Sequence, residues 1–98
     1  MAAEQFVKDA IAHDQIVIFS KLSCGYCSMT KEIFTKLKAT FKAIELDERE
    51  DMDAIQDALQ EITGARSVPR VFINGKFIGG GSDVKKLNSN GELAKLIN

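Results

Sequence analysis

Residues 15–37 read QIVIFSKLSCGYCSMTKEIFTKL, and this stretch decides the fold. It begins with a β-branched and aromatic run, residues 15–19, that is typical of a buried strand. It ends with residues 28–37, whose apolar members at 29, 33, 34 and 37 recur at helical spacing. Between the two lies Cys24-Gly25-Tyr26-Cys27, which holds both cysteines of the chain. The stretch therefore predicts a strand, a C-x-x-C turn and a helix.

This arrangement places the sulfur of Cys24 at a helix N-terminus. Free backbone N–H groups and the positive end of the helix dipole favour a thiolate over a thiol there. The thiolate is the form that attacks disulfides, so the pair indicates a redox site. A structural zinc site usually needs about four N or S ligands, and two cysteines with the distant His13 fall short. A structural disulfide stays open, although closing so short a loop would add little stability.

Composition narrows the class of protein. The chain of 98 residues is long enough for one domain, residues 1–98, and is 45% hydrophobic and 28% charged. Its net charge is −1 with both signs interleaved, so we expect no nucleic acid and no membrane surface as partner. No apolar run approaches the roughly 20 residues of a membrane span, and the N-terminus lacks a signal-peptide pattern. A vicinal cysteine pair suits a reducing compartment, so we expect a cytoplasmic location, or an organelle if a transit peptide was removed.

The other segments predict the element order αβαβαββα. Helices are expected over about residues 3–13, over residues 52–62 with Gly64 as the terminating residue, and over residues 83–87 and 93–97. Strands are expected over residues 42–46, 68–73 and 76–79, the last two joined by Asn74-Gly75, a strong hairpin signal. The acidic residues 47–51 are interpreted as a solvent-facing loop and helix start. This order predicts an α/β, thioredoxin-like fold with a four-stranded mixed sheet flanked by helices.

Pro69 stands just before an apolar strand, and its geometry is open from the residues alone. A trans bond at the start of a strand is the commoner arrangement. A cis Val68–Pro69 bond would instead present the Val68 backbone beside the thiols.

Three motifs resemble the dithiol (class I) glutaredoxins. They are SKLSCGYC at residues 20–27, TGARSVPRVFI at residues 63–73 and GGGSD at residues 79–83. They occur in the family's order and separations, and the likeness covers essentially the whole chain. The resemblance implies a cis Val68–Pro69 bond and a groove for glutathione between the three segments.

The resemblance also implies residue roles. Cys24 would be the nucleophile and Cys27 the resolving thiol. Val68 would pair its backbone with the cysteinyl unit of glutathione beside Pro69. The remaining implied glutathione contacts are Lys21 and Gln56 on the glycyl carboxylate, Tyr26 as a groove wall, and Ser82 and Asp83 at the γ-glutamyl end.

Taken together, these roles imply a glutathione-dependent thiol–disulfide oxidoreductase. It would act as a monomer on glutathionylated and disulfide-bonded proteins, with glutathione as co-substrate. Gly25 replaces the proline of the commonest dithiol motif, and family members without that proline sometimes hold a [2Fe–2S] cluster between two subunits. The alternative is therefore an iron–sulfur carrier or redox sensor, a homodimer bridged through Cys24 with two glutathiones as further ligands. A binding module with idle thiols is disfavoured by the presence of Lys21, Val68-Pro69 and Asp83 together.

Overall fold

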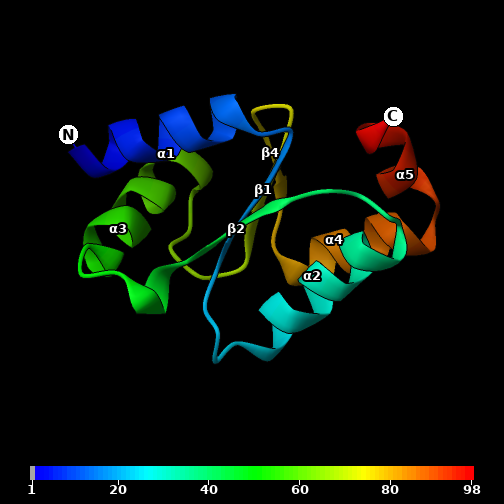
Figure 1. Ribbon diagram of the computed structural model, residues 1–98, viewed down its shortest axis with the longest axis horizontal. Helices are drawn as coiled ribbons and strands as arrows, with labels where there is room; N and C mark the ends of the chain where they lie inside the picture. Colours follow the sequence, from blue (N-terminus) through cyan, green and yellow to red (C-terminus); the bar gives the residue numbers. More distant parts are fainter. Residues whose placement is uncertain (1) are drawn as a thin grey trace.

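The structure is a computed structural model that describes residues 2–98. In chain order its elements are α1 (Ala2–His13), β1 (Ile16–Ser20), α2 (Gly25–Lys36), β2 (Lys42–Glu45), the 3-10 helix η1 (Leu46–Glu48), α3 (Met52–Thr63), β3 (Arg70–Ile73), β4 (Lys76–Gly79), α4 (Gly81–Ser89) and α5 (Glu92–Ile97). The predicted order is confirmed, with η1 as an addition (Figure 1). Several predicted boundaries are wrong, and the strand expected over residues 68–73 starts only at Arg70. The strand expected over residues 42–46 ends at Glu45 because Leu46 starts η1, and the helix expected from residue 83 already starts at Gly81.

The four strands form one mixed sheet in the order β2-β1-β3-β4. Strand β1 is parallel to β2, with Ser20 opposite Glu45, and antiparallel to β3, with Phe19 opposite Arg70. The ends of β1 and β2 and the start of β3 therefore lie at the same edge of the sheet. The loops that carry Cys24, η1 and Pro69 all lie at that edge.

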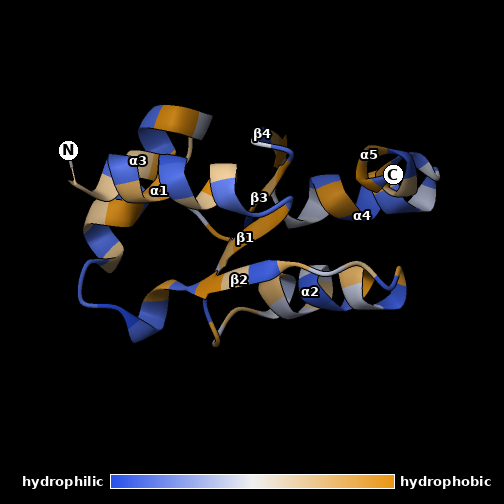
Figure 2. Cartoon of the chain, turned by 45° about the horizontal axis from the view of Figure 1, so that its top comes forward, coloured by the Kyte–Doolittle hydropathy of each residue, from blue (hydrophilic) through white to orange (hydrophobic). Residues whose placement is uncertain are grey.

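Helices cover both faces of the sheet, with α1 and α3 on one side and α2 and α4 on the other (Figure 1). Side chains alternate along β1, so that Val17 and Phe19 pack toward α1 and α3 while Ile16 and Ile18 pack toward Phe34 of α2. All five residues of β1 are buried. Figure 2 shows the resulting hydrophobic strands between helices whose outer faces are hydrophilic. This two-sided burial fixes the position of the strand that leads into the C-x-x-C motif.

The local turn predictions hold in the structure. Asn74 and Gly75 have φ angles of 53° and 79°, the positive pair that a two-residue hairpin loop of type I′ requires. Gly64 ends α3 in the left-handed region with φ 92°, and its N–H donates to the Gln60 carbonyl at 2.8 Å. The Val68–Pro69 bond is cis, as the resemblance implied.

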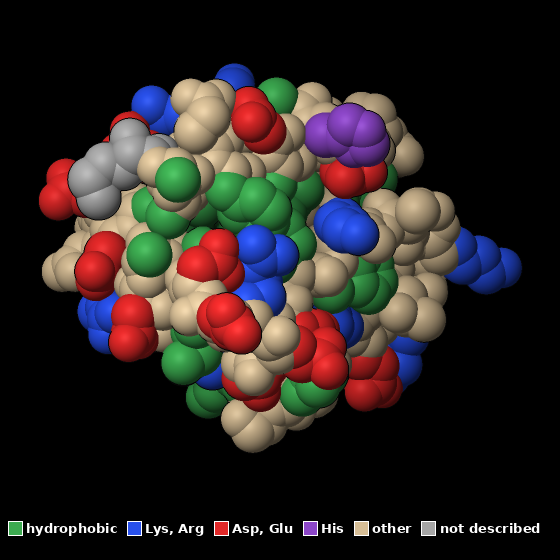
Figure 3. All heavy atoms as spheres, turned by 60° about the vertical axis from the view of Figure 1, so that its left-hand side comes forward, with side chains coloured by type: hydrophobic (Ala, Val, Ile, Leu, Met, Phe, Trp, Pro, Cys, Tyr) green, Lys and Arg blue, Asp and Glu red, His purple; other side chains and the backbone are tan. Residues whose placement is uncertain are grey.

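The surface carries charges of both signs. On the face shown in Figure 3, acidic and basic side chains are interleaved and form no continuous basic patch. Within residues 2–98, none of the helices has the length and apolar character needed to cross a membrane.

Candidate active site

Cys24 lies at the N-terminus of α2, as predicted. It is the N-cap residue, with extended backbone angles (φ −98°, ψ 118°), and its sulfur accepts a hydrogen bond from the Cys27 N–H at 3.2 Å. The Cys24 thiol also faces the Val68 carbonyl oxygen at 3.8 Å. Cys24 is half-buried, so it remains partly accessible from solvent.

Cys27 is placed differently, because it lies in the first turn of α2 and is 0% exposed. Both thiols are free. Burial, followed by the hydrogen bond to the neighbouring Cys24 thiol, raises the pKa of Cys27 to about 11, although a backbone hydrogen bond from Lys21 opposes the change. At neutral pH Cys27 is therefore a protonated thiol. The helix thus separates an accessible sulfur from a buried, protonated one.

A cavity of about 310 Å³ lies beside the cysteines. It is lined by Tyr26, Ser67, Pro69, Arg70, Gly80, Gly81, Ser82 and Asp83. Four of the predicted glutathione residues, Tyr26, Pro69, Ser82 and Asp83, therefore meet at one hollow.

Glycine is required where this cavity meets α4. Gly79 has φ 134°, and an added Cβ would lie 2.4 Å from the Asp83 Cβ. An added Cβ at Gly81 would lie 3.1 Å from the Tyr26 ring, so the ring packs against bare backbone. One oxygen of Asp83, Oδ2, accepts the Gly80 N–H at 2.9 Å. Asp83 therefore caps the start of α4 and still has a second oxygen for a ligand.

Lys21 and Gln56, two further predicted glutathione residues, do not line this cavity. The Lys21 carbonyl accepts the Cys24 N–H at 3.1 Å, so Lys21 is tied to Cys24 through the backbone. Gln56 is only 6% exposed, and its Nε2 donates to the Arg66 carbonyl at 2.8 Å. Gln56 thus holds the segment that leads to Val68, and its direct contact with glutathione stays a prediction.

Arg70 is a site residue that the sequence analysis did not single out. Its guanidinium lines the cavity and donates to Thr63 Oγ1 at 3.3 Å and Ser67 Oγ at 3.4 Å. Burial lowers the pKa of Arg70, and the charge of Asp83 partly offsets this. Within residues 2–98 no carboxylate oxygen lies within 4.0 Å of it, and its Nε is buried without a hydrogen-bond partner. The sequence feature that could have indicated Arg70 is its position directly after Pro69, at the start of a strand.

Asp47 is the second residue that sequence reasoning missed. Its carboxylate accepts the Leu22 N–H at 3.1 Å and the Ser23 N–H at 3.4 Å, within the loop that precedes Cys24. The Leu22 N–H is the main reason that the pKa of Asp47 is lowered, with the Ser23 N–H and the charge of Lys21 adding to it. The segment 47–51 was interpreted as a solvent-facing loop, and for Asp47 that interpretation is incomplete.

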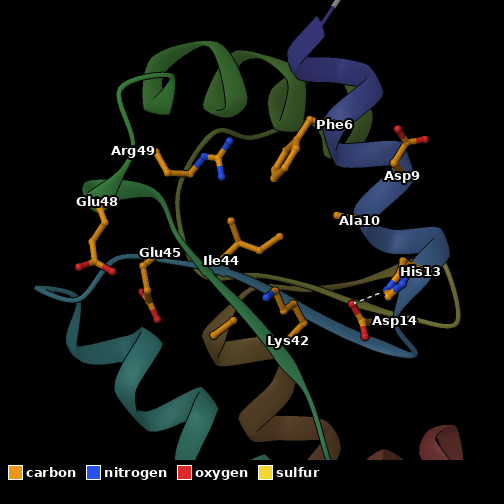
Figure 4. A pocket seen from close by; sticks show the side chains of 11 residues that line it. Phe6, Asp9, Ala10, His13, Asp14, Lys42, Ile44, Glu45, Glu48 and Arg49 are labelled. Atoms are coloured by element: carbon orange, nitrogen blue, oxygen red, sulfur yellow. Dashed lines mark hydrogen bonds and ion pairs between the residues drawn. The ribbon is translucent and has the colours of Figure 1, made fainter.

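A second hollow, of about 590 Å³, lies away from the cysteines between α1 and β2 (Figure 4). Arg49 lies over the Phe6 ring, 4.3 Å from its centroid, and His13 Nδ1 lies 3.2 Å from Asp14 Oδ2. This hollow contains no thiol. Among residues 2–98 no three His, Cys, Asp or Glu side chains are grouped so that they could hold a metal ion.

Comparison with known proteins identifies the family. The family model for glutaredoxin matches residues 16–78. Glutaredoxin-2, mitochondrial, from Mus musculus is 47% identical over 91 residues, which are 93% of this chain and 58% of that protein. Glutaredoxin-C4 from Arabidopsis thaliana is 52% identical over 92 residues, 94% of this chain and 68% of that protein. The chain thus spans little more than half the length of the mouse relative.

Solved structures agree with this match. The holo form of glutaredoxin C1 from Populus tremula x tremuloides is 40% identical with a TM-score of 0.96, covering 99% of this chain and 96% of that one. The buckwheat glutaredoxin–glutathione complex is 44% identical with a TM-score of 0.95, covering 98% of this chain and 87% of that one. These matches span the C-x-x-C motif and the strands that position it. The chain belongs to the glutaredoxin family.

Proposed function

We propose that the chain is a glutathione-dependent thiol–disulfide oxidoreductase that reduces protein–glutathione mixed disulfides and protein disulfides. The observation that supports this most directly is the pair of sulfurs, with Cys24 accessible at the helix N-terminus and Cys27 0% exposed behind it. The solved complex of buckwheat glutaredoxin with glutathione supports glutathione as the co-substrate.

In the first step the Cys24 thiolate attacks the glutathione sulfur of a mixed disulfide. A Cys24–glutathione disulfide forms, the substrate disulfide breaks, and the protein thiolate leaves and takes a proton from water. A second glutathione thiolate then attacks the glutathione sulfur bound to Cys24. This second exchange yields glutathione disulfide and restores the Cys24 thiolate. The enzyme supplies an exposed thiolate and orientation, and these set the rate of thiol–disulfide exchange.

With a protein disulfide, Cys24 forms a mixed disulfide with one substrate sulfur and releases the other. Cys27 then attacks the Cys24 sulfur, which frees the substrate and leaves a Cys24–Cys27 disulfide for two glutathiones to reduce. Because the Cys27 pKa is raised to about 11, this attack requires the loss of a tightly held proton. The glutathione route does not use Cys27.

The cavity would form one part of the proposed glutathione groove, the part lined by Tyr26, Ser82 and Asp83. Val68 would pair its backbone with the cysteinyl unit, and Lys21 would bind the glycyl carboxylate. The N–H groups of Ser82 and Asp83 at the start of α4 would receive the γ-glutamyl carboxylate, and the free oxygen of Asp83 would receive its ammonium group. Arg70 lines the same cavity without an ion-pair partner in residues 2–98, which favours an anionic ligand.

The two cysteines are expected to respond differently to substitution. Cys24→Ser should abolish both activities, because no other accessible thiol exists in residues 2–98. Cys27→Ser should keep the reduction of a glutathionylated peptide and lose protein-disulfide reduction by roughly tenfold or more. Steady-state kinetics on the two substrate types measure this, with thermal unfolding as the control for folding. Full turnover of the glutathionylated peptide by Cys24→Ser would contradict the assignment.

Two charges are expected to orient glutathione. Asp83→Asn keeps an oxygen for the Gly80 N–H but removes the charge, so kcat/KM for a glutathionylated peptide should fall roughly tenfold without loss of thermal stability. Lys21→Ala should lower kcat/KM by about the same factor. Asp83→Ala also removes the helix cap, so its melting temperature should fall as well. Asp9→Asn, on α1, is the matched control. Wild-type kinetics in both Asp83→Asn and Lys21→Ala would exclude the proposed roles.

A second candidate function, carriage or sensing of a [2Fe–2S] cluster, is favoured by Gly25. Apart from its two chain neighbours, an added Cβ at Gly25 would meet no atom within 4 Å, so the space beside the Gly25 backbone, next to Cys24 in the sequence, is open. Each chain offers one accessible thiol, whereas such a cluster commonly takes four thiolates. The residues therefore fit a cluster held by Cys24 from two chains and by two glutathione thiols. The cluster, when bound, would supply one-electron chemistry and would block Cys24 as a nucleophile.

Anaerobic incubation with iron, sulfide and glutathione should therefore give a coloured dimer, measured by visible absorbance and size-exclusion chromatography. Gly25→Pro should suppress assembly because the proline ring occupies the open space and fixes φ. Gly25→Ala is the matched control and should still assemble, since its methyl group meets no atom. Cys27→Ser should assemble and Cys24→Ser should not. A colourless monomer from the wild-type chain would remove this second function.

A further inference from the structure

The loop between β1 and α2 is held by a residue from another element. The turn closes through the Cys24 N–H on the Lys21 carbonyl at 3.1 Å. The two backbone N–H groups inside the turn, those of Leu22 and Ser23, point to Asp47. They donate to its two carboxylate oxygens at 3.1 and 3.4 Å. Consecutive backbone N–H groups that converge on one anion form a specific binding geometry.

The sheet topology explains why Asp47 reaches this loop. Strands β1 and β2 are parallel, and Ser20 lies opposite Glu45 at their ends. The residues that follow each strand therefore lie side by side. Leu46 is 0% exposed and packs in the core, and the Arg49 N–H donates to its carbonyl at 3.1 Å. Asp47 is thus presented from a fixed turn, η1, and not from a freely moving segment.

The loop has few other contacts to hold it. The Leu22 side chain is 57% exposed. Asp47 supplies the only side-chain hydrogen bonds to the Leu22 and Ser23 N–H groups in residues 2–98. Lys21, the cation whose charge acts on Asp47, adds attraction at the start of the loop. Without the carboxylate, both N–H groups would turn to water and the loop could adopt other conformations.

We propose that Asp47 is a positioning residue for the reaction, which holds the loop so that Lys21 and Cys24 keep their places relative to the glutathione cavity. It touches neither the substrate nor the reacting sulfurs, and it acts through the Leu22 and Ser23 backbone. The proposal rests on the function proposed above. The sequence analysis had placed Asp47 only in the solvent-facing acidic segment 47–51.

The test compares Asp47→Ala, Asp47→Asn and Asp51→Ala, all from the full chain. Asp47→Ala should raise KM for a glutathionylated peptide roughly tenfold with a smaller change in kcat, because Lys21 binds the ground state. Asp47→Asn keeps one carbonyl acceptor and should lose only about threefold. Asp51 is bound to Arg49 at 2.8 Å on the same segment and makes no contact with the loop, so Asp51→Ala should match wild type. If the substitution only reduced the folded fraction of the protein, the apparent kcat would fall and KM would stay unchanged.

Amide hydrogen exchange gives a second readout that does not depend on turnover. The Leu22 and Ser23 amide protons should exchange faster in Asp47→Ala than in wild type, by roughly tenfold, and by less in Asp47→Asn. This comparison also holds if Asp47→Ala proves unstable, because Asp47→Asn alone can be measured. Unchanged KM together with unchanged exchange would overturn the proposal, and so would equal losses in the Ala and Asn variants. Absence of glutathione-dependent turnover in the wild-type chain would contradict the proposed function instead, while exchange still reports on Asp47.

Discussion

The proposed chemistry depends on the start of α2, where a single turn of backbone places two cysteine sulfurs in different environments. Cys24 caps the helix and receives the Cys27 N–H at 3.2 Å, whereas Cys27 itself is 0% exposed. A helix N-terminus stabilises negative charge, and an apolar interior opposes it. The proposed roles of Cys24 as nucleophile and Cys27 as resolving thiol therefore follow from one helix turn, provided that the turn is held in place.

The sheet holds that turn in place. Because β1 is parallel to β2 and antiparallel to β3, three segments far apart in the sequence meet at one edge. The first carries Cys24, the second carries Asp47, and the third carries Val68 with its carbonyl 3.8 Å from the Cys24 sulfur. The start of α4 completes the cavity through the close packing of Tyr26 on Gly81. The site is thus a consequence of strand order, and Gly79 and Gly81 leave room for the Asp83 and Tyr26 side chains that line the cavity.

Local features and the four-stranded mixed sheet could be predicted from the sequence, whereas individual side-chain contacts between distant elements could not. The strand before Cys24, the Asn74-Gly75 turn and the Gly64 helix end each follow from the conformations that a few adjacent residues allow. The cis Val68–Pro69 bond required the resemblance to glutaredoxins, because proline statistics alone favour trans. The contacts of Asp47 and Arg70 were missed because their partners lie on other segments of the chain, and the spacing of apolar residues carries no information about such contacts. Gln56 was placed on the correct helix, but its burial and its bond to the Arg66 carbonyl depend on packing.

The central claim, that α2 separates the two sulfurs into an accessible thiolate site and a buried thiol, can be measured directly. The reduced protein is treated with iodoacetamide over a range of pH, and each cysteine is followed by mass spectrometry. Since the Cys27 pKa is raised from 9.0 to about 11, the account predicts that Cys24 alone is modified below pH 9.0 and that Cys27 reacts only as the pH approaches about 11. Modification of both cysteines at similar rates at about pH 8 in the folded protein would contradict this separation of the two sulfurs.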